Sequence, residues 1–172
     1  MTKKSIILTI LVILLIFFFV SCKEKIVIPD TPAAGTLLSY NGCKTFQRDT
    51  DKENPQNDPR KECLEYEYDG TDVLYLNHIN AGFNCCPGKI VAEIDIKNNI
   101  ITIIEKETDP SCRCLCLFDV KYKFLNLEQG EYRIRIEGPC HSEAEKALEF
   151  TLKLFSPLSG IHCVNRTNYP WG

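Results

Sequence analysis

Alternation between apolar and polar side chains is the feature of this chain that most constrains its fold. In residues 132–137, Tyr132, Ile134 and Ile136 alternate with two arginines and a glutamate. Comparable alternating or apolar segments occupy residues 63–68, 73–78, 90–97, 100–107 and 112–124. Successive side chains of a β-strand point to opposite faces, so a two-residue period predicts strands.

Turn signals separate these segments. Asp69-Gly70 and Asn98-Asn99 each lie between two of them, and a loop that contains Gly130 follows residues 112–124. Asp-Gly and similar pairs favour the tight turns of β-hairpins, because their backbones adopt positive φ at low cost. We therefore expect the segments on either side of each turn to pair as hairpins.

The carboxyl-terminal part requires a choice between a helix and a strand. Residues 142–145 match a helix capping box, but residues 148–154 alternate strictly between apolar and polar side chains. We expect a strand, preceded at most by one helical turn. With residues 36–40 and a short segment near Ile161, the chain contains eight or nine strands. This count predicts an all-β fold, namely an antiparallel β-sandwich, with a β-barrel as the alternative.

The first 22 residues have the organisation of an export signal. Lys3 and Lys4 precede an apolar run over residues 6–20, which ends at Phe19-Val20-Ser21-Cys22. The run is shorter than the roughly 20 residues that a helix needs to cross a bilayer, so a signal peptide is favoured over a membrane span.

The last four residues of this signal resemble the lipobox of bacterial lipoproteins. In that family the cysteine is linked to diacylglycerol, the chain is cleaved before it, and its new amino group is acylated. The resemblance covers residues 1–22 and implies lipidation of Cys22 and attachment to a membrane of the cell envelope, facing the periplasm or the cell surface. The alternatives are a simple secretory signal or an uncleaved anchor, with Cys22 incidental.

The chain divides into a signal peptide (residues 1–21), a lipidated tether (residues 22–36) and one β-sandwich domain (residues 37–172). Pro29, Pro32 and a lack of periodicity characterise the tether. Loss of residues 1–21 removes Lys3 and Lys4 from the 20 basic residues and none of the 23 acidic ones, which makes the mature chain acidic. No basic cluster is present, so we expect no nucleic acid partner.

The sequence has 10 cysteines, and nine remain when Cys22 is set aside. Export to an oxidising compartment makes disulfides the default, and an odd number leaves at least one thiol unpaired. Cys43 and Cys63 flank a polar loop, and we expect them to pair because the bridge would order that loop. Cys140 and Cys163 bracket the last strand and form a second candidate pair.

The other five cysteines form two clusters, Cys85-Cys86 and the alternating Cys112, Cys114 and Cys116. In a strand the three alternating thiols would share the face of Phe118 and the apolar residues beyond it, so we expect them to crosslink or fill the core. A bridge to Cys85 or Cys86 would join the clusters.

A thiolate site for zinc or copper(I), or a redox-active thiol pair, is the alternative for these five cysteines. A strand separates Cys112 from Cys116 by about 13 Å, so one ion could bind all three thiols of the triplet only if the strand were bent. We expect no cofactor otherwise.

Few other residues suggest a site. We expect His78, His141 and His162 at the surface. The chain has no nucleophile elbow, phosphate loop or paired histidine and glutamate motif, so it does not suggest an enzyme.

An exposed apolar patch could be formed by Tyr169, Trp171 and residues 75–83. The sequence thus predicts an anchored lipoprotein whose disulfide-stabilised β-domain is a binding or structural module, for an envelope protein or an extracellular ligand.

Overall fold

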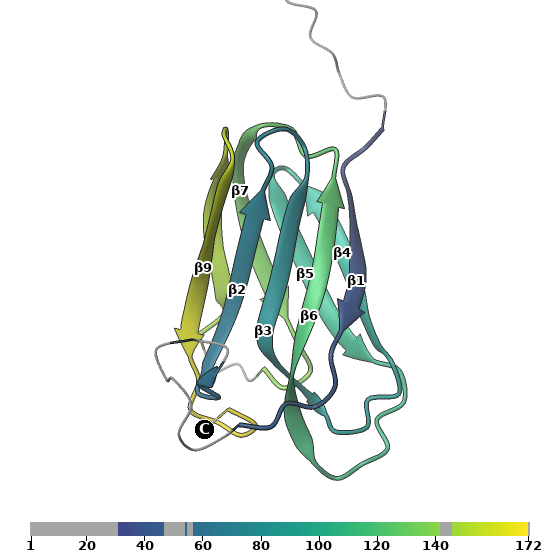
Figure 1. Cartoon of the computed structure of the whole chain (residues 1–172). Coiled ribbons are helices and arrows are strands. Elements are labelled where there is room, and N and C mark those ends of the chain that lie inside the picture. The colour runs from purple at the N-terminus through teal and green to yellow at the C-terminus, as the bar shows by residue number, and fades with distance from the viewer. Residues whose placement is uncertain (1–30, 47–53, 55–56, 142–145, 172) are drawn as a thin grey trace, which may run out of the picture. The chain divides into compact units, whose positions relative to one another are not determined.

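The computed structural model describes residues 31–46, 54, 57–141 and 146–171. These residues contain nine strands (Figure 1), which are β1 (Ala34–Tyr40), β2 (Lys61–Tyr68), β3 (Leu74–Asn84), β4 (Ile90–Lys97), β5 (Ile100–Glu107), β6 (Leu115–Leu125), β7 (Gly130–Glu137), β8 (Leu148–Leu154) and β9 (Leu158–Asn165). Among the described residues, no helix is long and apolar enough to cross a membrane.

The strands form two sheets that pack face to face. One sheet has the order β1-β6-β3-β2-β9 and the other the order β4-β5-β7-β8. In Figure 1 the five-stranded sheet lies in front of the four-stranded one. The predicted all-β sandwich is confirmed. The two sheets remain separate, so the described strands do not form the closed barrel that was the alternative.

Two of the three expected hairpins form. The β2–β3 and β4–β5 pairs are antiparallel neighbours. The Asp69 side chain shapes the first turn, where its Oδ1 accepts the backbone N–H groups of Thr71 and Val73 at 2.8 and 3.1 Å. In the second turn Asn98 and Asn99 have φ values of 51° and 59°, the left-handed pair that a two-residue hairpin loop requires.

The expected hairpin between β6 and β7 is wrong, because the two strands belong to different sheets. Asn126 has a φ of 58° just after β6, and the buried Leu127 donates its backbone N–H to the carbonyl of Asp72. These residues direct the chain away from β6 toward the other sheet. There β7 pairs in parallel with β5, the one parallel pair between described strands.

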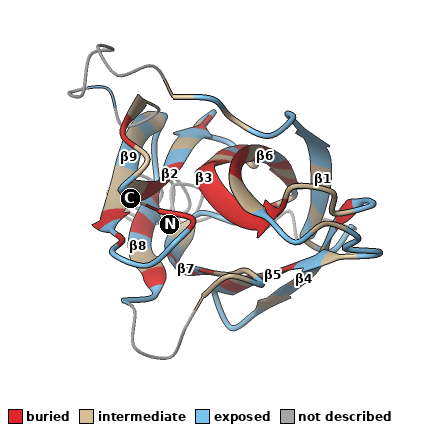
Figure 2. Ribbon diagram, turned by 90° about the horizontal axis from the view of Figure 1, so that it is seen from below, coloured by how far each residue is buried: buried red, intermediate tan, exposed pale blue. Residues whose placement is uncertain are grey.

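The core lies between the inner faces of the sheets (Figure 2), where buried residues alternate with exposed ones along the strands. On β6 the inward residues Phe118, Val120, Tyr122 and Phe124 are all buried, as their alternation predicts. Each fully buried large apolar side chain contributes about 1.5–3 kcal/mol relative to an exposed one, so this face is a major source of stability.

Strand β3 is longer than expected because a bulge replaces the predicted end at His78. The register with β6 shifts between His78 and Ala81, and Asn80 has a φ of 62° in the bulge. Asparagine tolerates this conformation better than most residues. The strand then continues to Asn84 and reaches the cysteine-rich end of the sandwich.

Strand β1 begins at Ala34 and pairs with β6 from that residue on. Residues 34–36, which were assigned to the tether, therefore belong to the sheet. Cys22 and the capping-box segment, residues 142–145, lie outside the described residues.

Candidate functional site

A cluster of charged side chains lies between the two sheets. Glu62 on β2, His78 on β3 and Glu105 on β5 are all buried. The Nε2 atom of His78 lies 2.8 Å from a Glu62 oxygen, and its Nδ1 atom lies 2.9 Å from a Glu105 oxygen. The imidazole therefore connects carboxylates that come from opposite sheets, and the expectation that His78 is a surface residue is wrong.

Arg166, His141 and Trp171 surround the same cluster. The Nε atom of Arg166 donates to Glu62 at 2.5 Å, and His141 Nε2 lies 2.7 Å from the other Glu62 oxygen. The Trp171 ring stacks on His141 and lies under the Arg166 guanidinium, with centroid distances of 5.8 and 5.4 Å. Trp171 is fully buried, so it closes this end of the sandwich and is not part of the exposed apolar patch that was expected.

Opposing effects set the protonation of the cluster. Burial lowers the pKa of His78, but the charges and hydrogen bonds of Glu105 and Glu62 outweigh it and raise the pKa to about 10. Burial raises the pKa of Glu62, whereas hydrogen bonds from His141 and His78 bring it well below its usual range. Burial and the Glu105 charge raise the pKa of Tyr122, whose hydroxyl donates to Glu105 at 2.5 Å. The cluster thus holds a proton on His78 across the physiological range.

The geometry gives this cluster a structural role. Carboxylates occupy both ring nitrogens of His78, so the imidazole has no nitrogen left for a metal or a substrate. Buried charges are tolerated when they are paired. Glu62 and His78 are paired here, and Glu105 is held through its Oε1 atom. The cluster joins β2 and β3 to β5 without exposing a reactive group.

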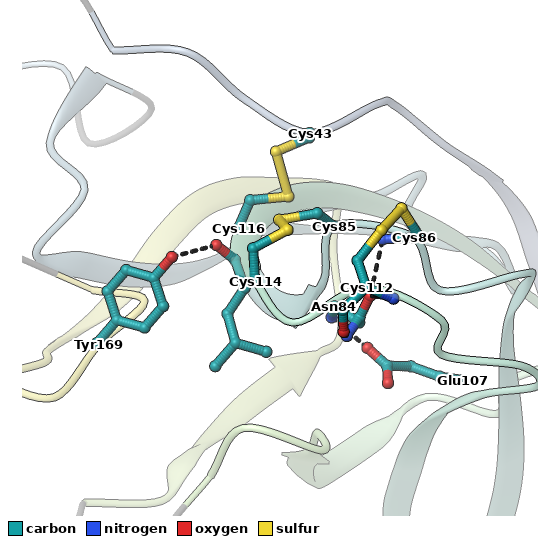
Figure 3. The surroundings of a disulfide bond; sticks show 10 residues. Cys43, Asn84, Cys85, Cys86, Glu107, Cys112, Cys114, Cys116 and Tyr169 are labelled. Atoms are coloured by element: carbon teal, nitrogen blue, oxygen red, sulfur yellow. Dashed lines mark hydrogen bonds between the residues drawn. A yellow bond between two sulfur atoms is a disulfide. The ribbon is translucent and has the colours of Figure 1, made fainter.

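Four disulfides join Cys43–Cys116, Cys63–Cys163, Cys85–Cys114 and Cys86–Cys112. Figure 3 shows three of them together, where the turn after β3 meets the chain before β6. The turn and the triplet are thus joined directly, and a disulfide-stabilised β-domain is what the structure shows.

Both pairings that were expected from loop closure are wrong. Cys63 pairs with Cys163 and not with Cys43, because β9 lies beside β2 in a register that places the two residues directly opposite each other. Cys43 pairs with Cys116, since the chain after β1 runs along β6. Each partner is set by strand order and not by the length of a loop.

The structure separates the three alternating cysteines. Cys116 belongs to β6 and packs against the core, as expected. Cys112 and Cys114 precede β6, which begins at Leu115, and Cys114 is exposed. Asn84 holds this segment: its Oδ1 accepts the N–H groups of Cys86 and Cys112, and its Nδ2 donates to the Cys112 carbonyl at 2.7 Å (Figure 3). Its own N–H donates to Glu107. The hydrogen bonds of Asn84 therefore position the turn for crosslinking.

Cys140 is the one cysteine of the described residues outside a disulfide. Burial, together with the negative charges of Glu107 and Glu62, raises the pKa of its thiol to about 12. A protonated thiol is a poor nucleophile and a poor metal ligand, so this shift disfavours reaction of Cys140 at neutral pH.

The disulfides bring several sulfurs close together. The sulfur atoms of Cys43, Cys85 and Cys116 lie within 4.8 Å of one another, and Cys114 is bonded to Cys85. Four thiolates around zinc, with bonds of about 2.3 Å, would have comparable mutual distances. Reduction of these disulfides would therefore leave four thiols close together. This group differs from the metal site expected from the sequence, because it includes Cys43.

The outer face of the five-stranded sheet carries ordered rows of polar side chains. Lys123 on β6, Tyr75 on β3 and Glu67 on β2 occupy consecutive register positions. The next row places Lys121, Asn77 and Glu65 in the same order. Neighbouring strands are about 4.8 Å apart, so in each row a lysine and a glutamate stand roughly 10 Å apart with a central residue between them.

A hollow of about 610 Å³ lies over these rows. Leu38 on β1 and Ile161 on β9 line it from the two edge strands, and both side chains are exposed. At its centre Tyr75 is 42% exposed, and the Lys123 ammonium lies 5.5 Å from the centroid of the tyrosine ring. The volume lies within the range of about 300–1,000 Å³ that small-molecule sites occupy.

The residues that the sequence analysis singled out as exposed do not lie together in the structure. Tyr75 lines the hollow, but Phe83 at the other end of the same segment is buried. Tyr169 is exposed, as expected, and donates its hydroxyl to the Leu115 carbonyl beside the disulfides (Figure 3). His162 is half-buried and stacks on Phe150 with a centroid distance of 4.7 Å.

Comparison of the chain with known protein families, curated proteins and solved structures found no match.

Proposed function

We propose that this protein is an exported lipoprotein, held on a membrane of the cell envelope by acyl chains on Cys22, whose β-sandwich is a binding module. The lipobox-like end of residues 1–22 supports the anchor. The four disulfides are compatible with export, since such bonds persist in oxidising compartments. The hollow on the five-stranded sheet is the observation that carries the binding role.

A neutral saccharide fits this hollow best. A sugar ring has a flat apolar face that can stack on an aromatic side chain such as Tyr75. Its hydroxyls can donate to Glu65 and Glu67 and accept from Lys121. Glu65, Glu67 and Lys121 all line the hollow, so part of their charge is offset within it and a ligand needs no net charge of its own to bind there.

Titration of the mature domain with soluble oligosaccharides of hexose and N-acetylhexosamine units tests this role. We expect at least one member of the panel to bind, and Tyr75→Ala to abolish its binding. Tyr40→Ala is the matched control, since Tyr40 is an exposed aromatic residue of the same sheet that does not line the hollow. Binding only of charged peptides, or saccharide binding that Tyr75→Ala leaves unchanged, would contradict the assignment.

Membrane attachment has a separate test. We expect wild-type protein in the membrane fraction of the producing cell and Cys22→Ser protein in the soluble fraction. Cys140→Ser removes another unpaired cysteine and should leave the distribution unchanged. Membrane attachment of the Cys22→Ser variant would refute lipidation at this position.

The compact sulfur group supports a second candidate function, the binding of zinc or copper(I) by Cys43, Cys85, Cys114 and Cys116. Soft thiolates select these ions. This function requires the two disulfides to be reduced. Counting free thiols and bound metal in protein purified without reductant decides between the candidates, because an oxidised, metal-free protein eliminates this one.

A further inference from the structure

Lys44 connects the chain after β1 to the bulge in β3. Its Nζ atom lies 2.7 Å from Oδ1 of Asn80 and 2.8 Å from Oδ1 of Asp119, which is on β6. The Asn80 side chain is fully buried, and the side chains of Lys44 and Asp119 are 13% and 21% exposed. An amine, a carboxamide and a carboxylate from three separate segments thus meet in a largely desolvated place.

The carboxamide is held in one orientation. Asn80 Nδ2 donates to the carbonyls of Asp58 and Lys61, at 3.0 and 2.8 Å. These bonds turn Oδ1 toward Lys44. Asp119 Oδ1 accepts the Asn80 backbone N–H at 3.1 Å in addition to the Lys44 ammonium, so the carboxylate is fixed against both residues.

The amine is also restrained. The backbone N–H of Lys44 donates to the Leu117 carbonyl at 2.8 Å, and the preceding residue, Cys43, is disulfide-bonded to Cys116. A carbonyl bond is about 1.2 Å long, so a contact of 2.7 Å to Oδ1 places Nζ at most about 3.9 Å from the Asn80 carbonyl carbon. Reacting atoms held about 3–3.5 Å apart in the right orientation react as if they were at very high concentration, and this upper bound lies close to that range.

We propose that Lys44 and Asn80 form an intramolecular isopeptide bond, with Asp119 as the proton carrier. Asp119 takes a proton from the Lys44 ammonium, and the freed lone pair of Nζ forms a bond to the carbonyl carbon of Asn80. Asp119 returns the proton to Nδ2, and the bond from the carbonyl carbon to Nδ2 breaks as ammonia forms. The ammonia takes the second proton that Nζ loses and leaves as ammonium. A lysine ammonium and a carboxamide thus give a secondary amide and ammonium, so the reaction needs no oxidant, reductant or other reactant.

The bond would covalently join the segment that follows β1 to the central strand β3. A domain held through its amino end is pulled at β1, which is an edge strand with hydrogen bonds to β6 alone among the described strands. The Lys44–Asn80 bond lies on the far side of β1 from the amino end. It would therefore pass the pull to β3 and stop the chain from unravelling beyond residue 44 if β1 were pulled off β6.

Peptide mapping by mass spectrometry tests the bond on the mature wild-type protein. After reduction, alkylation and trypsin digestion, we expect a branched peptide that joins Lys44 to residue 80 and is lighter than its two parts by one ammonia. Trypsin should not cleave after Lys44, because the side chain is no longer a free amine. Complete recovery of linear peptides, with cleavage after Lys44 and an intact Asn80, would overturn the proposal.

Asp119→Asn tests the role of the carboxylate, since it keeps the size of the side chain and removes the base. We expect this variant to give only linear peptides, as should Lys44→Arg. Lys153→Arg, a change at an exposed lysine of β8, should retain the branched peptide. Disulfide mapping verifies that each variant has folded. A branched peptide in folded Asp119→Asn protein would overturn the assignment of Asp119.

Discussion

The imidazole of His78 lies 2.8 Å from the carboxylate of Glu62 inside the sandwich, where their side chains are 1% and 0% exposed. Glu105 binds the other side of the ring. This arrangement makes the stability of the fold depend on pH in a defined direction.

Stability should fall as pH rises from about 6.5 toward 10. The pKa of His78 is raised in the folded state to about 10 from its ordinary value of 6.5, so the protein binds one more proton folded than unfolded between these values. The contribution of His78 is therefore complete below pH 6.5 and is lost through pH 10. Urea unfolding of a Cys140→Ser variant, which removes thiol exchange at high pH, measures the slope. Constant stability between pH 6.5 and 10 would show that His78 is not charged.

Folding stability should also fall at acid pH, as Glu62 becomes protonated. Its pKa is lowered in the folded state, so its contribution is present above its ordinary value of 4.5 and decreases as the pH falls below it. The same urea titrations, extended downward, should place maximal stability between pH 4.5 and 6.5. Stability that increased from pH 4.5 to pH 3 would exclude an ionised Glu62 in the core.

Arg166→Met should destabilise the domain by about 3–5 kcal/mol, because it leaves a buried carboxylate without its guanidinium partner. Arg166→Lys keeps the charge and should cost less, although it loses the planar contact with Trp171. Urea unfolding at pH 6 compares the two variants. Equal losses would mean that packing, and not charge, is what Arg166 provides.

The Cys63–Cys163 bond should contribute about 4–5 kcal/mol. It has a sequence separation of 100, and long loops give the largest entropic effect on the unfolded chain. The double variant Cys63→Ser with Cys163→Ser removes the bond without creating a free thiol. Cys140→Ser is the control and should change the free energy of unfolding by less than about 0.5 kcal/mol. A double variant as stable as the control would contradict the pairing.

Gly35→Ala should be costly, whereas Gly42→Ala should be neutral. A Cβ atom at Gly35 would lie 2.5 Å from the buried Phe124 ring and 2.7 Å from Ile94 Cγ2, while nothing lies within 4 Å of one at Gly42. Overpacking of this kind costs about 1–3 kcal/mol. Thermal unfolding of the two variants gives the comparison, and a neutral Gly35→Ala would mean that β1 can move away from the core.

The local part of the fold could be predicted from the sequence, because a strand leaves a two-residue period in the chain. Strands that are neighbours along the chain, such as β4 and β5, pair through tight turns, and asparagine and glycine residues mark the positions of those turns in the sequence. The parallel pairing of β7 with β5 and the position of β9 beside β2 depend on contacts between distant segments, which no local pattern encodes. The disulfide partners follow from those contacts, and this is why predictions based on loop closure failed.

The sequence contains a partial signal of the buried cluster around His78. His78 continues the apolar face of Leu74 and Leu76, and Glu105 continues that of Ile101 and Ile103. A titratable residue at an inward position predicts a buried charge that needs a partner. Trp171 left no such signal, since it lies beyond the last strand and packs only through tertiary contacts.

Mapping of non-reduced peptides from the natively produced mature protein tests the central claim, an oxidised and lipid-anchored β-domain, most directly. The account predicts an acylated amino-terminal peptide beginning at Cys22. It also predicts the linkages Cys43–Cys116, Cys63–Cys163, Cys85–Cys114 and Cys86–Cys112, with Cys140 as the free thiol. An unacylated chain that retains Met1 and has reduced cysteines throughout would contradict it.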